Sequence, residues 1–157
     1  MKLNLGSGKD YREGYINIDK LERFNPDVLC DIRELEYPEG SVEEIVAQDV
    51  IDHITFMEAK ALLRQCFKWL KPRGSLNIHT PNLKVLGQEA AWGNVTALEW
   101  LYGTRGEGNT AYETNIIRWC YSPKSLQAIL ENFGFQILQV QPTCLGMAFR
   151  MIAVKPE

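Results

Sequence analysis

Short apolar runs that each end at a glycine or an aspartate constrain the fold of this chain more than any other feature. The runs and the residues that end them are 3–5 with Gly6, 15–18 with Asp19, 28–30 with Asp31, and 45–48 with Asp49. Brief apolar runs bounded by such residues are typical of strands buried inside a parallel sheet. The first third of the chain therefore predicts four parallel strands.

Two helices have strong start and stop signals. Thr55 and Glu58 form a Thr-x-x-Glu capping box, and an apolar stripe at helical spacing follows it. Ser122 is a good N-cap, Pro123 suits the first helical position, and Gly134 favours a stop. The alternation of such helices with buried strands predicts an α/β fold with an open, mostly parallel sheet.

Three further strands are expected, at residues 75–79, 135–141 and 147–154. The last two are separated only by residues 142–146, a length that suits a hairpin. We therefore expect the final pair of strands to be antiparallel.

Residues 83–121 interrupt this alternation of strands and helices. Asn94 can cap a short helix through Tyr102, and a glycine-rich loop follows over 103–109. An irregular insertion of this length inside a compact domain is typical of a lid or a binding loop. We expect a single domain over residues 1–157, with 83–121 as a lid that binds the second substrate.

Composition disfavours several classes of protein. The 17 Lys and Arg residues against 20 Asp and Glu give a formal net charge of −3, and nucleic-acid binding needs a basic surplus. No apolar run is long enough for a membrane span, and the N-terminal residues lack the apolar core of a secretory signal. The four cysteines form no Cys-x-x-Cys pair. We therefore expect a cytoplasmic protein with no nucleic-acid partner, no membrane insertion and no metal.

The residues that end the four strands predict a binding site, because the carboxyl ends of parallel strands meet at one edge of the sheet. The carboxylate of Asp19 can accept from both hydroxyls of a ribose, and that of Asp31 from the exocyclic amine of adenine. Three clustered carboxylates would repel a polyphosphate and favour a nucleoside that carries a positive centre. The alternative is that each aspartate is a turn former at the end of its strand.

The same residues resemble a known family. Residues 3–8 and 14–19 look like the opening of the small class I S-adenosylmethionine-dependent methyltransferases. The similarity continues in residues 28–32, 47–54, 70–76, 81–83 and 126–135. It spans nearly the whole chain, although it is thin over 84–117.

The resemblance implies a Rossmann-like, seven-stranded sheet with an antiparallel last strand, and S-adenosylmethionine as cofactor. The interval between Gly8 and Tyr15 is too short for the family's usual first helix, so we expect that helix to be shortened. Lys9 could replace the positive end of that helix, or it could simply be solvated. By resemblance, the cofactor-binding residues are Leu5, Gly6, Ser7 and Gly8 along the methionine part, Asp19 at the ribose, Asp31 and Ile32 at the adenine, and Gln48 and Asp49 at the sulfonium.

The expected activity is transfer of a methyl group to a small-molecule or carbohydrate-type acceptor. A hydroxyl acceptor needs a base, for which His53 is the first candidate and Asp49 the second. His53 could instead fix its turn through a hydrogen bond. Relatives often carry a histidine where this chain has Ile117, so a base at that position is not expected. Aromatic, amide and guanidinium groups that could form the acceptor wall are Tyr112, Asn115, Arg118, Trp119 and Tyr121.

Two other functions remain open at this level. The chain could bind S-adenosylmethionine without catalysis, a reading that Ile117 supports. It could also be a nicotinamide-dependent oxidoreductase, because Gly6-x-Gly8 followed by Asp19 faintly resembles the dinucleotide fingerprint. That fingerprint, however, requires a third glycine and a following helix, and the sequence has neither at this place.

Overall fold

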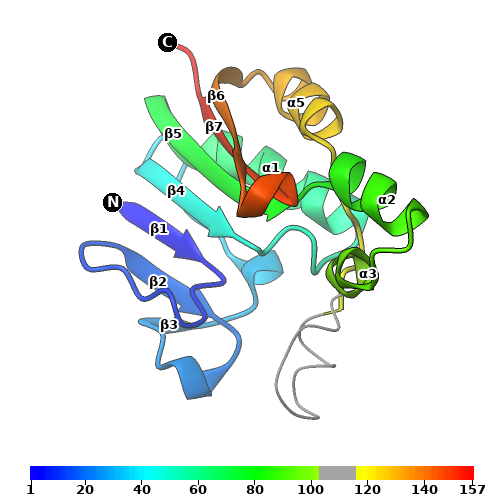
Figure 1. The fold of residues 1–157 in the computed structure, drawn as a ribbon. Helices are drawn as coiled ribbons and strands as arrows, with labels where there is room; N and C mark the ends of the chain where they lie inside the picture. Colours follow the sequence, from blue (N-terminus) through cyan, green and yellow to red (C-terminus); the bar gives the residue numbers. More distant parts are fainter. Residues whose placement is uncertain (103–115) are drawn as a thin grey trace.

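The computed structural model describes residues 1–102 and 116–157, and its centre is a seven-stranded sheet in the order β3-β2-β1-β4-β5-β7-β6 (Figure 1). The strands are β1 (Lys2–Leu5), β2 (Ile16–Asp19), β3 (Val28–Leu29), β4 (Val42–Gln48), β5 (Leu70–Pro81), β6 (Gln136–Thr143) and β7 (Ala148–Val154). Strands β1 to β5 pair in parallel, whereas β7 is antiparallel to both of its neighbours. This arrangement confirms the expected Rossmann-like sheet.

Four α-helices and three single helical turns connect the strands in the described part of the chain. They are α1 (Phe56–Trp69), α2 (Leu83–Ala91), α3 (Val95–Tyr102) and α5 (Pro123–Asn132), together with the single turns η1 (Glu22–Phe24), η2 (Ile32–Glu34) and η3 (Cys144–Gly146). No helix in the described part of the chain is long and apolar enough to cross a membrane.

The predicted helix starts are confirmed in atomic detail. The backbone N–H of Thr55 donates to Oε2 of Glu58 at 2.8 Å, and the N–H of Glu58 donates to the Thr55 hydroxyl at 3.4 Å, which is a complete capping box. At α5 the Ser122 hydroxyl accepts from the N–H of Ser125 at 3.1 Å, with Pro123 in the first turn. Local sequence therefore determines where both long helices begin.

The two faces of the sheet differ in chemistry. One face carries the apolar core, and Figure 1 shows α1 and α5 on the same side of the sheet. The other face is largely polar: one row across the strands reads Asn17, Asn4, Val46, Asn77 and Ile152. Parallel sheets usually bury apolar residues on both faces, whereas here the buried residues of the second face include Asn4 and Asn17.

A loop over residues 6–15 takes the place of the first helix. We expected that helix to be shortened, but the segment contains only turns and bends. The loop covers the polar face near β1, where the Asn4 side chain donates to the Asp10 carbonyl at 2.6 Å and to Oδ1 of Asn17 at 3.0 Å. Arg12 N–H donates to the same Asn17 oxygen at 2.8 Å. Two buried asparagines thus anchor the loop where apolar residues would anchor a helix.

Some boundaries differ from those expected. Strand β5 begins at Leu70, directly where α1 ends, rather than at residue 75. Helix α2 was not expected, because residues 83–121 were interpreted as an irregular insertion, but Asn82 caps it by accepting from the N–H of Lys84 at 3.2 Å. The expected helix from Asn94 is present as α3, so the described part of 83–121 is more helical than a loop.

Candidate functional site

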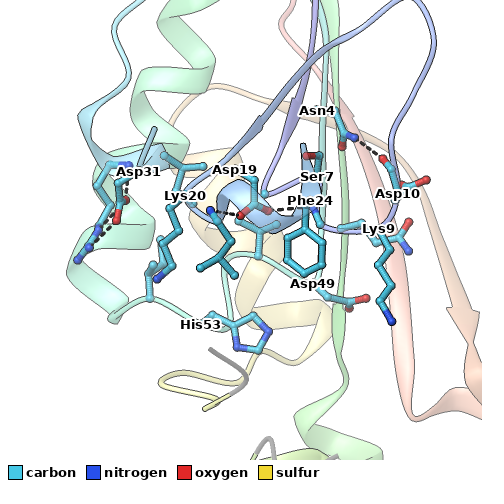
Figure 2. Close-up of a pocket in the computed structure, with 18 of the residues that line it drawn as sticks. Asn4, Ser7, Lys9, Asp10, Asp19, Lys20, Phe24, Asp31, Asp49 and His53 are labelled. Atoms are coloured by element: carbon cyan, nitrogen blue, oxygen red, sulfur yellow. Dashed lines mark hydrogen bonds and ion pairs between the residues drawn. The ribbon is translucent and has the colours of Figure 1, made fainter. Parts of the chain in front are cut away.

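A cavity of about 1190 Å³ opens at the carboxyl ends of the parallel strands (Figure 2). Small-molecule sites commonly measure about 300–1,000 Å³, so this cavity has room for a nucleoside and a second small compound. The predicted site residues that line it are Gly6, Ser7, Gly8, Asp19, Asp31, Ile32, Gln48, Asp49, His53 and Arg118. The strand ends therefore converge as the sequence predicted.

The turn after β1 depends on glycine. Gly6 and Gly8 have φ values of +60° and +48°, in the left-handed region that other residues rarely adopt. A Cβ added to Gly6 would lie 2.7 Å from Cγ2 of Val50. Leu5 precedes this turn with a fully buried side chain and does not line the cavity, so it supports the turn from the core.

Asp19 joins the glycine turn to the end of β2. Its Oδ2 accepts from the N–H of Gly8 at 2.8 Å, and its Oδ1 accepts from the N–H of Leu21 at 2.9 Å. The side chain is 7% exposed, and Figure 2 shows it near the centre of the cavity lining. Each carboxylate oxygen has two lone pairs, so both oxygens retain capacity for hydroxyl donors.

Asp31 is held by an arginine that the sequence prediction missed. Arg33 Nε donates to Oδ1 of Asp31 at 2.9 Å and its Nη2 to Oδ2 at 2.7 Å, while its Nη1 reaches Oε1 of Glu58 at 2.6 Å. The hydrogen bonds from Arg33 lower the pKa of Asp31 despite partial burial. The Thr55 N–H, and then Arg33, lower the pKa of Glu58 to about 2. Both acids are therefore ionised at neutral pH, and Arg33 links η2 to α1.

Asp49 follows β4 with a left-handed backbone, at φ 53°. Its Oδ1 lies 2.7 Å from Nδ1 of His79, and Nε2 of the same ring lies 2.8 Å from the Thr143 hydroxyl. A carboxylate can only accept, so the Nδ1–H of His79 donates to Asp49. A polar chain therefore connects the cavity edge to β5 and β6.

His53 has protein groups at both ring nitrogens. Its Nδ1 lies 3.1 Å from the carbonyl oxygen of Ile116, so Nδ1 carries the hydrogen and donates. Its Nε2 lies 3.5 Å from Oδ2 of Asp52, a carboxyl that is 1% exposed. Burial raises the pKa of Asp52 to about 6, opposed by the nearby His53 and reinforced by Asp49. The neutral ring thus has Nε2 as its basic nitrogen, close to the cavity and to a buried acid.

The acceptor wall is only partly as expected. Arg118 lines the cavity, whereas Trp119 packs on Phe56 with ring centroids 4.8 Å apart and remains 45% exposed outside the lining. Tyr121 requires a correction: its side chain is completely buried in the core, so it packs rather than contacting an acceptor. Tyr112 and Asn115 lie outside the described residues.

Besides Arg33, the sequence prediction missed four lining residues in the segment that follows Asp19. They are Lys20, Leu21, Arg23 and Phe24. Figure 2 places the Phe24 ring in the middle of the lining, beside Asp19. The sequence indicated these residues only by their position, directly after the aspartate that ends β2. At such positions in a parallel sheet the chain leaves the strand at the carboxyl edge.

Sequence comparisons agree with this geometry. Residues 10–140 match the sequence model of a family described as a methyltransferase domain. The chain is 31% identical over 128 residues to the mitochondrial ubiquinone biosynthesis O-methyltransferase of Bos taurus, a match that covers 74% of this chain and 31% of that protein. It is 40% identical over 48 residues to the phosphoethanolamine N-methyltransferase of Plasmodium falciparum, covering 31% of this chain and 18% of that protein. The chain therefore spans less than a third of each of these relatives.

Solved structures share the fold at low sequence identity. An S-adenosylmethionine-dependent methyltransferase from Methanosarcina mazei has a TM-score of 0.67 at 18% identity, covering 99% of this chain and 92% of that one. A 1,6-didemethyltoxoflavin N1-methyltransferase from Burkholderia thailandensis, solved with S-adenosylhomocysteine, has a TM-score of 0.65 at 16% identity, covering 99% and 71%. The family match extends over most of the chain, and the sheet has the seven strands and the antiparallel last strand that the resemblance implied. The chain therefore belongs to the class I S-adenosylmethionine-dependent methyltransferase family.

Proposed function

We propose that the chain binds S-adenosylmethionine at the carboxyl edge of its sheet and transfers the methyl group to a small-molecule or carbohydrate-type acceptor. The observation that carries this proposal is the convergence of the Gly6–Gly8 turn, Asp19, Asp31 and Asp49 on one cavity. The names of the relatives support the reaction class: both curated relatives are methyltransferases. The solved relative from Burkholderia thailandensis, with S-adenosylhomocysteine and a small acceptor bound, supports the assignment of the cavity.

The residues around the cavity fit the parts of this cofactor. Bare backbone at Gly6 and Gly8 admits the methionine part, and Lys9, which also lines the cavity, provides a cation for its carboxylate. Asp19 accepts from the ribose hydroxyls, and Asp31 with Ile32 frames the adenine. Gln48 and Asp49 border the sulfonium.

When bound, the cofactor supplies an activated methyl group on a positively charged sulfur. The protein contributes alignment of the acceptor with that methyl group, which can be worth several kcal/mol. It also has to remove a proton from a hydroxyl acceptor. We assign this role to His53, because its Nδ1–H is used on the Ile116 carbonyl and its Nε2 is left basic. Asp49 is the second candidate.

The acceptor is expected beside His53 and Arg118, under the lid of residues 83–121. The Arg118 guanidinium lines the cavity and donates well to oxygen-rich compounds. Trp119 packs on Phe56 outside the lining, but it follows Arg118 directly, and its exposed part suits the apolar face of a sugar ring that extends beyond the cavity. Tyr112 and Asn115 complete this proposed wall.

Calorimetry with S-adenosylhomocysteine tests the cofactor assignment. Asp19→Asn keeps the shape of the side chain but removes its charge, so we expect affinity to fall about 10- to 100-fold, the usual value of a charged hydrogen bond. Glu43→Gln is the matched control, because Glu43 is an exposed carboxylate paired with Lys71 outside the cavity lining. An unchanged affinity in Asp19→Asn, or tight binding of NADH by the native chain, would overturn the proposal.

A second function, cofactor binding without catalysis, is favoured by one observation: Nε2 of His53, the nitrogen that would take the proton, lies 3.5 Å from the buried carboxyl of Asp52 as well as beside the cavity. Turnover of a labelled methyl group over a panel of alcohols, amines and sugars separates the two functions. Transfer to any acceptor, lost in His53→Gln with cofactor affinity retained, supports the enzyme. Tight cofactor binding with no transfer to any class supports the binding module.

A further inference from the structure

The Asp49 carboxylate at the cavity edge is hydrogen-bonded to a histidine on the neighbouring strand β5. Asp49 lies just beyond β4, and its N–H donates to the His79 carbonyl on β5 at 2.9 Å. The His79 ring returns to Asp49, with Nδ1 and Oδ1 2.7 Å apart. The two residues are thus joined by one backbone hydrogen bond and one side-chain hydrogen bond. Figure 2 shows Asp49 at the margin of the lining.

We propose that His79 is a positioning residue, which holds the Asp49 carboxylate toward the sulfonium so that the site selects the positively charged cofactor over its neutral product. This inference rests on the proposed function. It assigns a role to a histidine that the reaction itself does not use.

His79 is itself firmly held. Its side chain is 11% exposed, and its Nε2 lies 2.8 Å from the Thr143 hydroxyl at the end of β6. Because the Nδ1–H donates to Asp49, Nε2 of the neutral ring accepts from Thr143. The Asp49 carboxylate therefore fixes the tautomer, and the Thr143 hydroxyl helps to hold the orientation of the ring, in the way that a third group orients the base in catalytic triads.

Asp49 needs such a partner more than the other two strand-end aspartates. Asp19 accepts from two backbone N–H groups, and Asp31 is held by Arg33 on both oxygens. The Asp49 side chain is 43% exposed, and the only side-chain partner found among the described residues is His79. Without that ring the carboxylate is free to turn into solvent, where its field at the cavity is screened.

The charge of Asp49 already acts within the site, since it contributes to the raised pKa of the buried Asp52. S-adenosylmethionine would carry a positive charge on its sulfur, whereas S-adenosylhomocysteine is neutral, because the methyl group is then bonded through a lone pair of the acceptor and the former sulfur–methyl electron pair remains on sulfur. A fixed carboxylate beside that sulfur therefore favours S-adenosylmethionine before the reaction. It gives no such advantage to S-adenosylhomocysteine, which is then displaced more easily.

The test compares calorimetric affinities for S-adenosylmethionine and S-adenosylhomocysteine in the same variants, which requires no acceptor. Asp49→Asn should lower the preference for S-adenosylmethionine about threefold to tenfold, with little change for S-adenosylhomocysteine. His79→Leu should lower the preference in the same direction. His79→Asn, whose amide can replace the Nδ1–H donor, should restore most of it. A merely structural role would weaken both ligands equally and leave their ratio unchanged.

The outcomes separate the two proposals. If the native chain binds neither ligand, the proposed function fails and this inference falls with it. If S-adenosylhomocysteine binds but His79→Leu leaves the ratio at the native value, with the variant folded by circular dichroism, only the role of His79 is overturned. If Asp49→Asn also leaves the ratio unchanged, Asp49 does not lie at the sulfonium.

Discussion

Gly6→Ala is the substitution for which the structure gives the clearest expectation. Two costs arise at this position. An alanine has to adopt the left-handed backbone at φ +60°, and its new Cβ would lie 2.7 Å from Cγ2 of Val50, a core residue that is 6% exposed. Real Cβ atoms do not approach carbon so closely, so the turn or Val50 has to move.

The size of the effect follows from these two costs. A left-handed alanine costs about 1–2 kcal/mol, and overpacking in a core costs about 1–3 kcal/mol. The lower backbone entropy of the unfolded alanine chain offsets about 0.4–1 kcal/mol of this loss. We expect Gly6→Ala to lower the free energy of unfolding by about 2–4 kcal/mol, a large part of a typical domain's stability.

Gly14→Ala is the matched control, because Gly14 has φ +80° but no atom within 4 Å of an added Cβ. It should lose only the backbone contribution, about 1–2 kcal/mol. Urea unfolding followed by circular dichroism measures both variants. In a double-mutant cycle, Gly6→Ala with Val50→Ala should lose about 1–3 kcal/mol less than the sum of the single variants. Equal losses for Gly6→Ala and Gly14→Ala, with an additive cycle, would refute the steric reasoning.

Two further variants test buried polar groups. Burial raises the folded-state pKa of Asp52 to about 6, so its favourable contribution is complete below about pH 4 and is lost as the pH rises through 6. Between pH 4 and pH 7 the free energy of unfolding of the native chain should therefore fall relative to Asp52→Asn, by on the order of 2 kcal/mol in urea unfolding, and parallel pH profiles would contradict this. The Tyr121 hydroxyl is buried and finds no partner in the described part of the chain, so Tyr121→Phe should raise the free energy of unfolding by about 1 kcal/mol. A loss of that size in thermal or urea unfolding would mean that the hydroxyl has a partner.

The features that sequence alone predicted well are those with local causes. The capping box before α1 and the Ser122 N-cap before α5 are satisfied by residues three positions apart, so no knowledge of the rest of the fold was needed. The strand ends at Asp19, Asp31 and Asp49 were also local signals. Their convergence on one cavity followed from a general property of parallel sheets.

The features that sequence did not predict depend on contacts between distant segments. The clamp of Arg33 on Asp31 is local, but its link to Glu58 joins residues 25 positions apart. Tyr121 is a residue type that is common in sugar-binding sites, yet its side chain is buried in the core. Its backbone forms an isolated bridge with Asn82, just after the end of β5, and this pairing holds it there. Neither burial nor such pairing can be read from residue type alone.

The loop that replaces the first helix has a consequence for electrostatics at the site. A helix beginning after β1 would direct several free N–H groups and its positive dipole end at an anionic ligand. Here the N–H of Gly8 is engaged with Asp19, and the buried pair of Asn4 and Asn17 anchors the rest of the loop. The backbone therefore offers less positive potential to a ligand carboxylate than a helix would.

In the proposed site the positive charge has to come from a side chain, and Lys9 is the lysine that lines the cavity directly after the glycine turn. The family's cofactor chemistry is thus compatible with a sheet that has no helix after β1, provided that a lysine supplies part of the positive potential that such a helix would give.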